Sequence, residues 1–358
     1  MWFREKRLYA DAAASTPLSV AAKAELVRLL DLYGNPGGLH KEAVAAKEAL
    51  ADARKRVARA LECHVEELVF TGSGTEANNL AILGLLRPLL REQGEAHVIT
   101  TTIEHSSVLE PLHALEDDGL YVTALGVNHE GRIDLKELEE AINNQTVLVT
   151  IQMVNSEIGT IQDIREVSKL LKKQNRKIYL HCDASQAPLW QNITVERLGV
   201  DLQTLDGQKV MGPKGVGVLY IRKDTPVESI VWGGGQEHGL RAGTENAPLV
   251  GAFAVALEDA QKNYADNTKR VSEVRDYVWQ QIQKLIPDAV LNGAVGDRRI
   301  ANNINVSIPG LDAEMGVIAM DALGVAVSTR SSCDIGDEEP SHVIRAIGTP
   351  KDLQKTAI

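Results

Sequence analysis

The sequence is poor in cysteine and has no long apolar run. Its three cysteines, Cys63, Cys182 and Cys333, lie far apart in unrelated contexts, which matches neither a disulfide framework nor the paired ligands of a zinc site. No apolar run approaches the ~18–20 residues that cross a bilayer. The first residues, MWFREKRLYAD, lack the apolar core of a secretory signal. We therefore expect a cytoplasmic protein with no bound metal and no membrane association.

The sequence also lacks an excess of basic residues. It has 38 lysines and arginines against 49 acidic residues, which gives a formal net charge of −11. Sequence-independent binding of nucleic acid needs a broad basic face, so we expect no direct nucleic-acid partner. The basic stretches at 53–59 and 172–177 have the pattern of solvated helix faces. There is no internal repeat or low-complexity tract.

Short apolar segments alternate with helical patterns along most of the chain. The expected strands are 67–71, 96–101, 121–127, 146–154, 177–183 and 216–221. Helical patterns cover 134–143 and 162–174, begin at Thr75, and run from Asn246 to about residue 285. The strands are β-branched and almost continuously apolar, as is typical of strands buried on both faces. The fold class that this predicts is α/β, with a mainly parallel, doubly wound sheet.

The length indicates two domains, because single cores stop growing at ~250–300 residues. We expect a large domain at residues 15–250. We expect a smaller α+β domain formed by residues 1–14 with 251–358, entered through the long helical pattern. The texture changes after residue 301 to a strand, a helix at 312–323, and a polar loop that contains Cys333.

A lysine and an aspartate stand where the sheet is expected to bind a ligand. Lys209 lies on a Gly-flanked turn before a buried strand, and withdrawal from water there favours the neutral amine that a Schiff base needs. Asp183 ends an expected parallel strand, where ligand sites gather, and a carboxylate there can keep a pyridine nitrogen protonated. Gln186 can donate to a phenolic oxygen. A surface turn lysine and a helix-capping aspartate are the alternatives.

Two further segments follow strand ends. Gly72, Gly74 and Thr75 join a strand to a helix, so backbone N–H groups and the helix dipole favour a phosphate there, although a plain strand–turn–helix joint also uses glycine. His105 can lay its ring on a planar cofactor, and a buried, hydrogen-bonded histidine is the alternative.

Cys333 differs from the other two cysteines in its surroundings. It lies in STRSSCDIGDEEPSH (328–342), a composition typical of an exposed loop. Four acidic neighbours disfavour the thiolate, and Arg330 is the one nearby cation. Cys63 and Cys182 have the contexts of buried residues.

Taken in order, these segments resemble the cysteine desulfurases, which are fold-type-I, pyridoxal phosphate-dependent enzymes of the class-V aminotransferase group. The resemblance covers nearly the whole chain and is specific to the desulfurase and selenocysteine-lyase branch. It is carried by YADAAASTPL, GNPGGLH (34–40), TGSGTEANNLAI, TTIEHSSV, VNSEIGTIQ (154–162), HCDASQ, the lysine segment with MGPKGVG, GGGQEHGLRAGTEN (233–246) and SSC…EPSHVIRAIG (331–348).

The resemblance implies roles for the residues around the cofactor ring. Lys209 is expected to hold pyridoxal 5'-phosphate as a Schiff base, and Asp183 to pair with the ring nitrogen. Gln186 is expected at the phenolic oxygen, and His105 is expected to stack on the ring.

The resemblance also implies phosphate and substrate contacts. Gly74 and Thr75 are expected to bind the phosphate, with Thr244 supplied by the other subunit of a homodimer. Asn155 and Asn35 are expected to seat the substrate, L-cysteine.

The activity that follows is conversion of L-cysteine to L-alanine with transfer of sulfur to Cys333 as a persulfide. The acceptor is expected to be an iron–sulfur scaffold or a tRNA-thiolation enzyme. The alternatives are selenocysteine lyase, another class-V enzyme, and a catalytically weakened homologue that acts as a binding or regulatory subunit.

The chain departs from the family pattern in three places. The usual Ser-Gly-His-Lys run is Asp206-Gly207-Gln208-Lys209 here. A carboxylate close to the phosphate is repelled by it, so Asp206 is expected to face away, pair with a cation or be protonated. Gln208 removes a titratable proton carrier. The sequence stops at KTAI (355–358), where the family continues to an arginine that grips the substrate carboxylate. Candidate substitutes are Arg241, Arg330 and Arg345.

Overall fold

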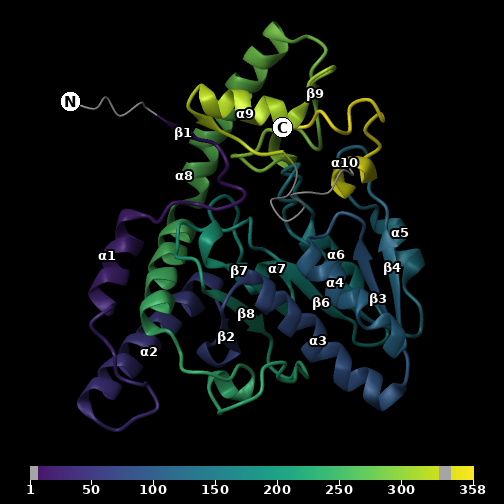
Figure 1. The fold of residues 1–358 in the computed structure, drawn as a ribbon. Helices are drawn as coiled ribbons and strands as arrows, with labels where there is room; N and C mark the ends of the chain where they lie inside the picture. The colour runs from purple at the N-terminus through teal and green to yellow at the C-terminus, as the bar shows by residue number, and fades with distance from the viewer. Residues whose placement is uncertain (1–6, 330–339) are drawn as a thin grey trace, which may run out of the picture.

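The computed structural model describes residues 7–329 and 340–358 (Figure 1). Within this part, a seven-stranded sheet has the order β2-β8-β7-β6-β5-β3-β4. Neighbouring strands from β7 to β4 run parallel, and β8 is antiparallel to both β2 and β7. The strands are β2 (Leu68–Thr71), β3 (Ala96–Thr101), β4 (Leu120–Leu125), β5 (Thr146–Thr150), β6 (Tyr179–Asp183), β7 (Leu202–Asp206) and β8 (Gly217–Ile221). The mainly parallel α/β sheet is confirmed.

Two strands differ from the sequence-based expectation. The strand expected at 146–154 ends at Thr150. The chain beyond it stays beside β6, because the N–H of Met153 donates to the carbonyl of Asp183 over 2.8 Å. Strand β7 is absent from the expected set. Its polar residues Gln203 and Thr204 interrupt the apolar pattern, although both are fully buried.

Helices cover both faces of the sheet (Figure 1). On one face Leu80 of α3 (Gly74–Gln93) and Leu112 of α4 (Ser106–His113) pack with Val98 of β3. On the other face Val57 of α2 (Lys41–Leu61) belongs to an apolar cluster with Leu180 of β6. That cluster also takes in α6 (Ile164–Lys172), α7 (Val195–Leu198) and the first half of α8 (Ala247–Leu285). The remaining helices of this lobe are α1 (Val20–Leu29) and α5 (Leu135–Ala141).

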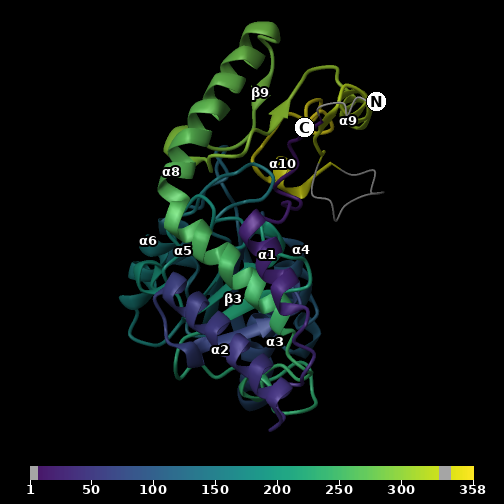
Figure 2. The ribbon, with the colours of Figure 1, turned by 90° about the vertical axis from the view of Figure 1, so that its left-hand side faces the viewer.

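The long helix α8 runs from the sheet lobe into a second, smaller lobe (Figure 2). Its residues as far as Leu257 belong to the sheet core. The domain boundary expected at residue 250 therefore lies inside this helix and stays a prediction. The smaller lobe contains β9 (Val290–Leu291), β10 (Val306–Ser307), α9 (Ala313–Ala322), β11 (Val325–Ala326) and α10 (His342–Ala346). β1 (Leu8–Tyr9) joins it by pairing in parallel with β11.

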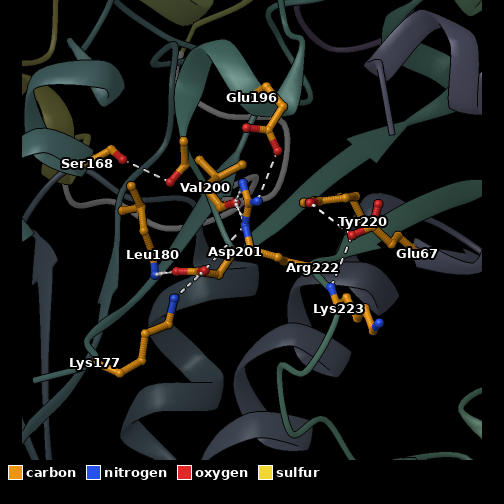
Figure 3. Close-up of polar contacts among 11 residues, drawn as sticks. Glu67, Ser168, Lys177, Leu180, Glu196, Val200, Asp201, Tyr220, Arg222 and Lys223 are labelled. Carbon is orange, nitrogen blue, oxygen red and sulfur yellow. Dashed lines mark hydrogen bonds and ion pairs between the residues drawn. The ribbon is translucent and has the colours of Figure 1, made fainter. Parts of the chain in front are cut away.

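An ion-pair cluster fixes the edge of the sheet at which β6 and β7 begin (Figure 3). The buried carboxylate of Asp201 accepts hydrogen bonds from Lys177 and from the N–H of Leu180. Arg222 lies 3.6 Å from the same carboxylate and also binds Glu196. Buried charges are tolerated when they are paired in this way. The opposite edge, where the parallel strands end, carries the polar side chains described next.

Within the described residues, we find no helix with the length and apolarity that spanning a bilayer requires.

Candidate active site

A cavity of about 950 Å³ lies over the edge where the parallel strands end. Topology dictates this place, since the carboxyl ends of neighbouring parallel strands bring their following loops together. Six of the residues predicted from the sequence line this cavity: Gly74, Thr75, His105, Asp183, Gln186 and Lys209. Asp206 and Gln208 line it as well.

Lys209 is held by the segment that precedes α1. It ends a short 3-10 turn, Gly207–Lys209, directly after β7, and it is half-buried. Its Nζ donates to the carbonyl oxygens of Ala13 over 2.6 Å and Ala14 over 2.8 Å. Gln186 also donates to the carbonyl of Ala13, over 2.9 Å. The turn at 11–14 thus orients both side chains at the cavity wall.

A chain of hydrogen bonds connects Asp183 with His105 through Asn78. The Nδ2 of Asn78 donates to Oδ2 of Asp183 over 2.7 Å and to Oγ of Ser107 over 2.8 Å. Nδ1 of His105 accepts from the backbone N–H of Ser107, so the neutral ring carries its proton on Nε2. The other oxygen of Asp183 accepts from the N–H of Ser185 over 2.9 Å. Asp183 is therefore held in one orientation from both sides.

Sequence reasoning missed Asn78, which is buried and lines the cavity. The one signal available was an Asn-Asn pair one helical turn after the glycine-rich joint, with one of the two asparagines on the apolar face of the helix. Its Oδ1 is buried and has no hydrogen-bond partner in the part of the chain that the structure describes. A buried acceptor of this kind calls for a donor from outside the protein, since burial without a partner is costly.

Two buried titratable groups lie behind Asp183. Glu104 is fully buried, and desolvation raises the pKa of its carboxyl to about 8. It accepts hydrogen bonds from Thr101 Oγ1 over 2.7 Å and from the N–H of Gln152 over 2.9 Å. Burial also lowers the pKa of His181 to about 4. Both shifts favour the neutral forms of these two groups at pH 7.

The joint between β2 and α3 already holds an anionic group, Asp206. Its Oδ2 accepts from the N–H of Gly74 and its Oδ1 from the N–H of Gln208, each over 3.0 Å. A Cβ at position 74 would lie 2.9 Å from the Cβ of Asp206, so this close approach requires glycine. Asp206 therefore faces the N-terminus of α3, where the phosphate is expected; we call this place the phosphate cradle. Of the three arrangements expected for Asp206, the one in which it faces away is wrong. The side chain of Ser73 caps the same helix by accepting from the N–H of Glu76.

Three predicted site residues do not line this cavity. Asn155 is buried beside His105 in a separate small pocket. Its amide donates to the carbonyl of Ile103 and accepts from two backbone N–H groups. Asn35 and Thr244 are exposed. Cys333 lies outside the described residues.

Of the three arginines proposed to grip a substrate carboxylate, the two that the structure describes do not line the cavity. Arg241 forms an ion pair with Glu76 over 2.8 Å, Arg345 is exposed, and Arg330 lies outside the described residues. Arg275 of α8 does line the cavity. Its Nη1 is engaged by the carbonyls of residues 299 and 300.

The other two cysteines have structural surroundings. Cys182 is fully buried within β6, and burial raises the pKa of its thiol well above the ordinary value. Burial also raises the pKa of the half-buried Cys63, to about 12. Within the described residues, no three or more histidine, cysteine or acidic side chains are grouped so that they could hold a metal ion.

The residues present fit pyridoxal 5'-phosphate. An amine at Lys209 and a fixed carboxylate at Asp183 line one cavity, and these are the two groups that a pyridine aldehyde requires of its protein. The unpartnered Oδ1 of Asn78 and the N-terminus of α3 supply further polar contacts. The phosphate fits less well than the ring and the aldehyde, because Asp206 already accepts a hydrogen bond at the N-terminus of α3.

Comparison with known proteins gives one consistent family. The family model described as aminotransferase class-V matches residues 8–350. The chain is 39% identical over 355 residues to "Cysteine desulfurase IscS" of Dictyoglomus turgidum, covering 99% of this chain and 89% of that protein. A solved structure titled "NifS-like protein" superposes with a TM-score of 0.91 at 31% identity, covering 98% of this chain and 92% of the other.

A second solved structure, "SspA in complex with cysteine", has a TM-score of 0.83 at 32% identity and covers 98% of this chain and 97% of that one. The family match and these full-length similarities agree with the fold. The chain belongs to the class-V aminotransferase family, in its pyridoxal phosphate-dependent cysteine desulfurase branch.

Proposed function

We propose that this protein is a cysteine desulfurase that converts L-cysteine to L-alanine and transfers the sulfur to Cys333 as a persulfide. The observation that carries the proposal is that Lys209 and Asp183 line one cavity in a chain of the desulfurase branch. A relative of the same fold has been solved in complex with cysteine, which supports cysteine as the substrate.

In this reaction the chain's residues bind, orient and hold protons. Bound pyridoxal phosphate supplies a ring that accepts negative charge from the substrate carbon. Lys209 supplies the amine. Its hydrogen bonds to the carbonyls of Ala13 and Ala14 hold this amine at the cavity wall. Asp183, fixed by Asn78, holds a proton on the ring nitrogen. His105 keeps its own proton on Nε2.

The sulfur step needs no external oxidant or reductant. The thiolate of Cys333 attacks the sulfur of the substrate, an S–S bond forms, and the C–S bond of the substrate breaks. The electron pair of that bond stays on the substrate carbon, which takes up a proton to become the methyl group of alanine. One cysteine and one protein thiol thus give one alanine and one persulfide.

The test measures alanine and persulfide after L-cysteine is added to the cofactor-loaded protein. We expect both products from the unaltered chain and neither from Lys209→Ala. Cys333→Ala should lose nearly all turnover of cysteine while keeping the cofactor. If Cys333→Ala keeps most of its activity, the protein is a lyase, such as a selenocysteine lyase, or a transaminase, and the sulfur-transfer role of Cys333 is wrong.

We further propose that the protein is a cytoplasmic homodimer with shared active sites, and that Gln186 faces the phenolic oxygen of the cofactor. Asn35 and Thr244 are exposed and do not line the cavity of their own chain, which supports contact with a second subunit. Asn155, buried beside His105, would seat the substrate. The persulfide would pass to an iron–sulfur scaffold or a tRNA-thiolation enzyme, and mixing with each acceptor followed by sulfur analysis tests this.

A catalytically weakened homologue that acts as a binding subunit is the second candidate. It is favoured by the position of Asp206 in the phosphate cradle and by Gln208, which cannot carry a proton. Such a protein would be purified without the yellow absorbance of the bound cofactor and would not gain it when the cofactor is added.

A further inference from the structure

The N-terminus of α3 offers few free donors to a phosphate. The N–H of Gly74 donates to Asp206, and the N–H of Glu76 donates to Ser73. In the first turn of α3, the N–H of Thr75 is left without a hydrogen bond to a described residue. An anion binds a helix N-terminus through these groups, so the carboxylate of Asp206 has taken a contact that a phosphate would otherwise make.

Asp206 is also poorly placed to move aside. It is 7% exposed, and it caps the 3-10 turn Gly207–Lys209 by accepting from the N–H of Gln208. Rotating the carboxylate away from Gly74 would break the cap of the turn that carries the reactive lysine. Phosphate binding and the position of Lys209 are therefore coupled through this one side chain.

Arg241, which lies close to this joint, is paired with a carboxylate other than Asp206. Arg241 lies near the same joint, where its Nη2 is 3.6 Å from the Cβ position of Gly72. Its guanidinium is paired with Glu76, whose other carboxylate oxygen accepts from the N–H of Gly72. Lys209 donates to the carbonyls of residues 13 and 14. A phosphate entering the cradle thus meets a carboxylate, and like charges at this range repel.

We propose that Asp206 is a specificity-determining residue that reduces the preference of this pocket for the phosphorylated form of vitamin B6 aldehyde. The carboxylate competes with the phosphate for the N-terminus of α3, while Lys209 and Asp183 bind the aldehyde and the ring, which are common to pyridoxal and its phosphate. The inference rests on the cofactor use described above, but it concerns binding and does not require turnover of cysteine.

The experiment titrates the cofactor-free protein with pyridoxal 5'-phosphate and with pyridoxal and follows the absorbance of the bound aldehyde. The variants are Asp206→Asn, which keeps the shape and removes the charge, and Asp206→Ser, which removes both. Asp134→Asn is the matched control, because Asp134 caps α5 and is exposed, so it changes the net charge equally. Inorganic phosphate, added at constant ionic strength, serves as a competitor.

For the unaltered chain we expect the two dissociation constants to lie within about tenfold of each other. In both Asp206 variants the preference for the phosphorylated aldehyde should rise by about tenfold or more, since removing one repulsive charge contact of about 1.4 kcal/mol gives this factor. Asp134→Asn should behave as the unaltered chain does. Phosphate should compete measurably with pyridoxal 5'-phosphate in the two Asp206 variants and not in the unaltered chain.

The proposal is overturned if the unaltered chain already prefers the phosphorylated aldehyde by about a hundredfold, or if the preference is the same in Asp206→Asn. If one variant fails to fold, the other variant and the titration of the unaltered chain still decide. If the desulfurase assay fails while the Asp206 variants still show the changed binding preference, the proposed function is wrong and this inference holds.

Discussion

The amide of Asn78 and the carboxylate of Asp183 are joined by a 2.7 Å hydrogen bond that links α3 to the end of β6. The same nitrogen donates to Ser107 at the start of α4. One side chain thus fixes the carboxylate at the centre of the site and connects three elements of the sheet lobe. Because Asn78 is buried, its loss would leave the oxygen of Asp183 without this donor.

Replacing Asn78 by alanine should lower turnover of L-cysteine by about tenfold or more, because Asp183 is no longer held in one orientation. Leaving a buried polar group unpaired also costs about 1–3 kcal/mol of stability, which chemical denaturation would measure. The absorbance maximum of the bound cofactor should shift, a signature that a purely structural role would not produce. Asn79→Ala is the control, since its amide bonds to the carbonyl of Thr75 at the surface. Equal effects of the two substitutions would contradict the positioning role.

Lys209 should be the site of covalent attachment. Reduction of the cofactor-loaded protein with borohydride, followed by peptide mapping, should place the label on this lysine. Lys214, which lies five residues further on and is exposed, should stay unlabelled. In Lys209→Ala we expect no trapped label and no turnover. Label on any other lysine would disprove the assignment of the reactive amine.

Glu104 should make stability depend on pH. Its folded pKa of about 8 lies above the ordinary value of 4.5, so between these values the folded protein holds a proton that the unfolded chain releases. Stability is therefore lost as pH rises from about 4.5 to about 8, and above that range the loss is complete and no longer changes with pH. The loss is at most about 5 kcal/mol, because one pKa unit corresponds to about 1.4 kcal/mol.

Glu104→Gln isolates this contribution, because every other titrating group is common to both proteins. The amide oxygen of the introduced glutamine can still accept from the N–H of Gln152, so the structure of the variant should be little changed. The stability of Glu104→Gln relative to the unaltered chain should increase from pH 5 to pH 8 in denaturant titrations and then level off. A stability difference that does not vary with pH would show that Glu104 stays ionised in the folded protein.

We expect the proposed homodimer to be held in part by the exposed apolar face of α1. Leu30, at the end of this helix, is 62% exposed, and a charge there is costly only if the surface is covered by another chain. Leu30→Glu should shift the protein towards monomer in sedimentation experiments and lower its activity. Leu285→Glu is the control, since Leu285 is 83% exposed at the far end of α8. Unaltered association in Leu30→Glu would place the interface elsewhere.

The sequence was informative where a polar residue stands next to a strongly apolar strand. Asp183 ends such a strand and Lys209 lies on a turn before another, and the alternation of strands and helices predicted the mainly parallel sheet. The pattern failed at β7, because Gln203 and Thr204 are polar yet buried. Burial of polar residues depends on partners from distant segments, and periodicity along the chain carries no information about them.

The rest of the site depends on contacts across the fold. Asn78 looks like an ordinary helix residue until Asp183 and Ser107 are placed beside it. The sequence showed that Asp206 was unusual, but only the structure showed its hydrogen bond to Gly74. The expected roles of Asn35, Thr244 and Cys333 stay predictions, because two of these residues lie outside the cavity and the third lies outside the described residues.

The turn at 11–14 has a consequence for how the two lobes communicate. Tyr9 pairs with Ala326 in the smaller lobe. Only a few residues later, the carbonyls of Ala13 and Ala14 accept hydrogen bonds from the amine of Lys209. Residues 9–14 thus connect Lys209 to strand β11, after which the chain continues towards Cys333. A shift of the smaller lobe would therefore be passed through residues 9–14 to the side chain of Lys209.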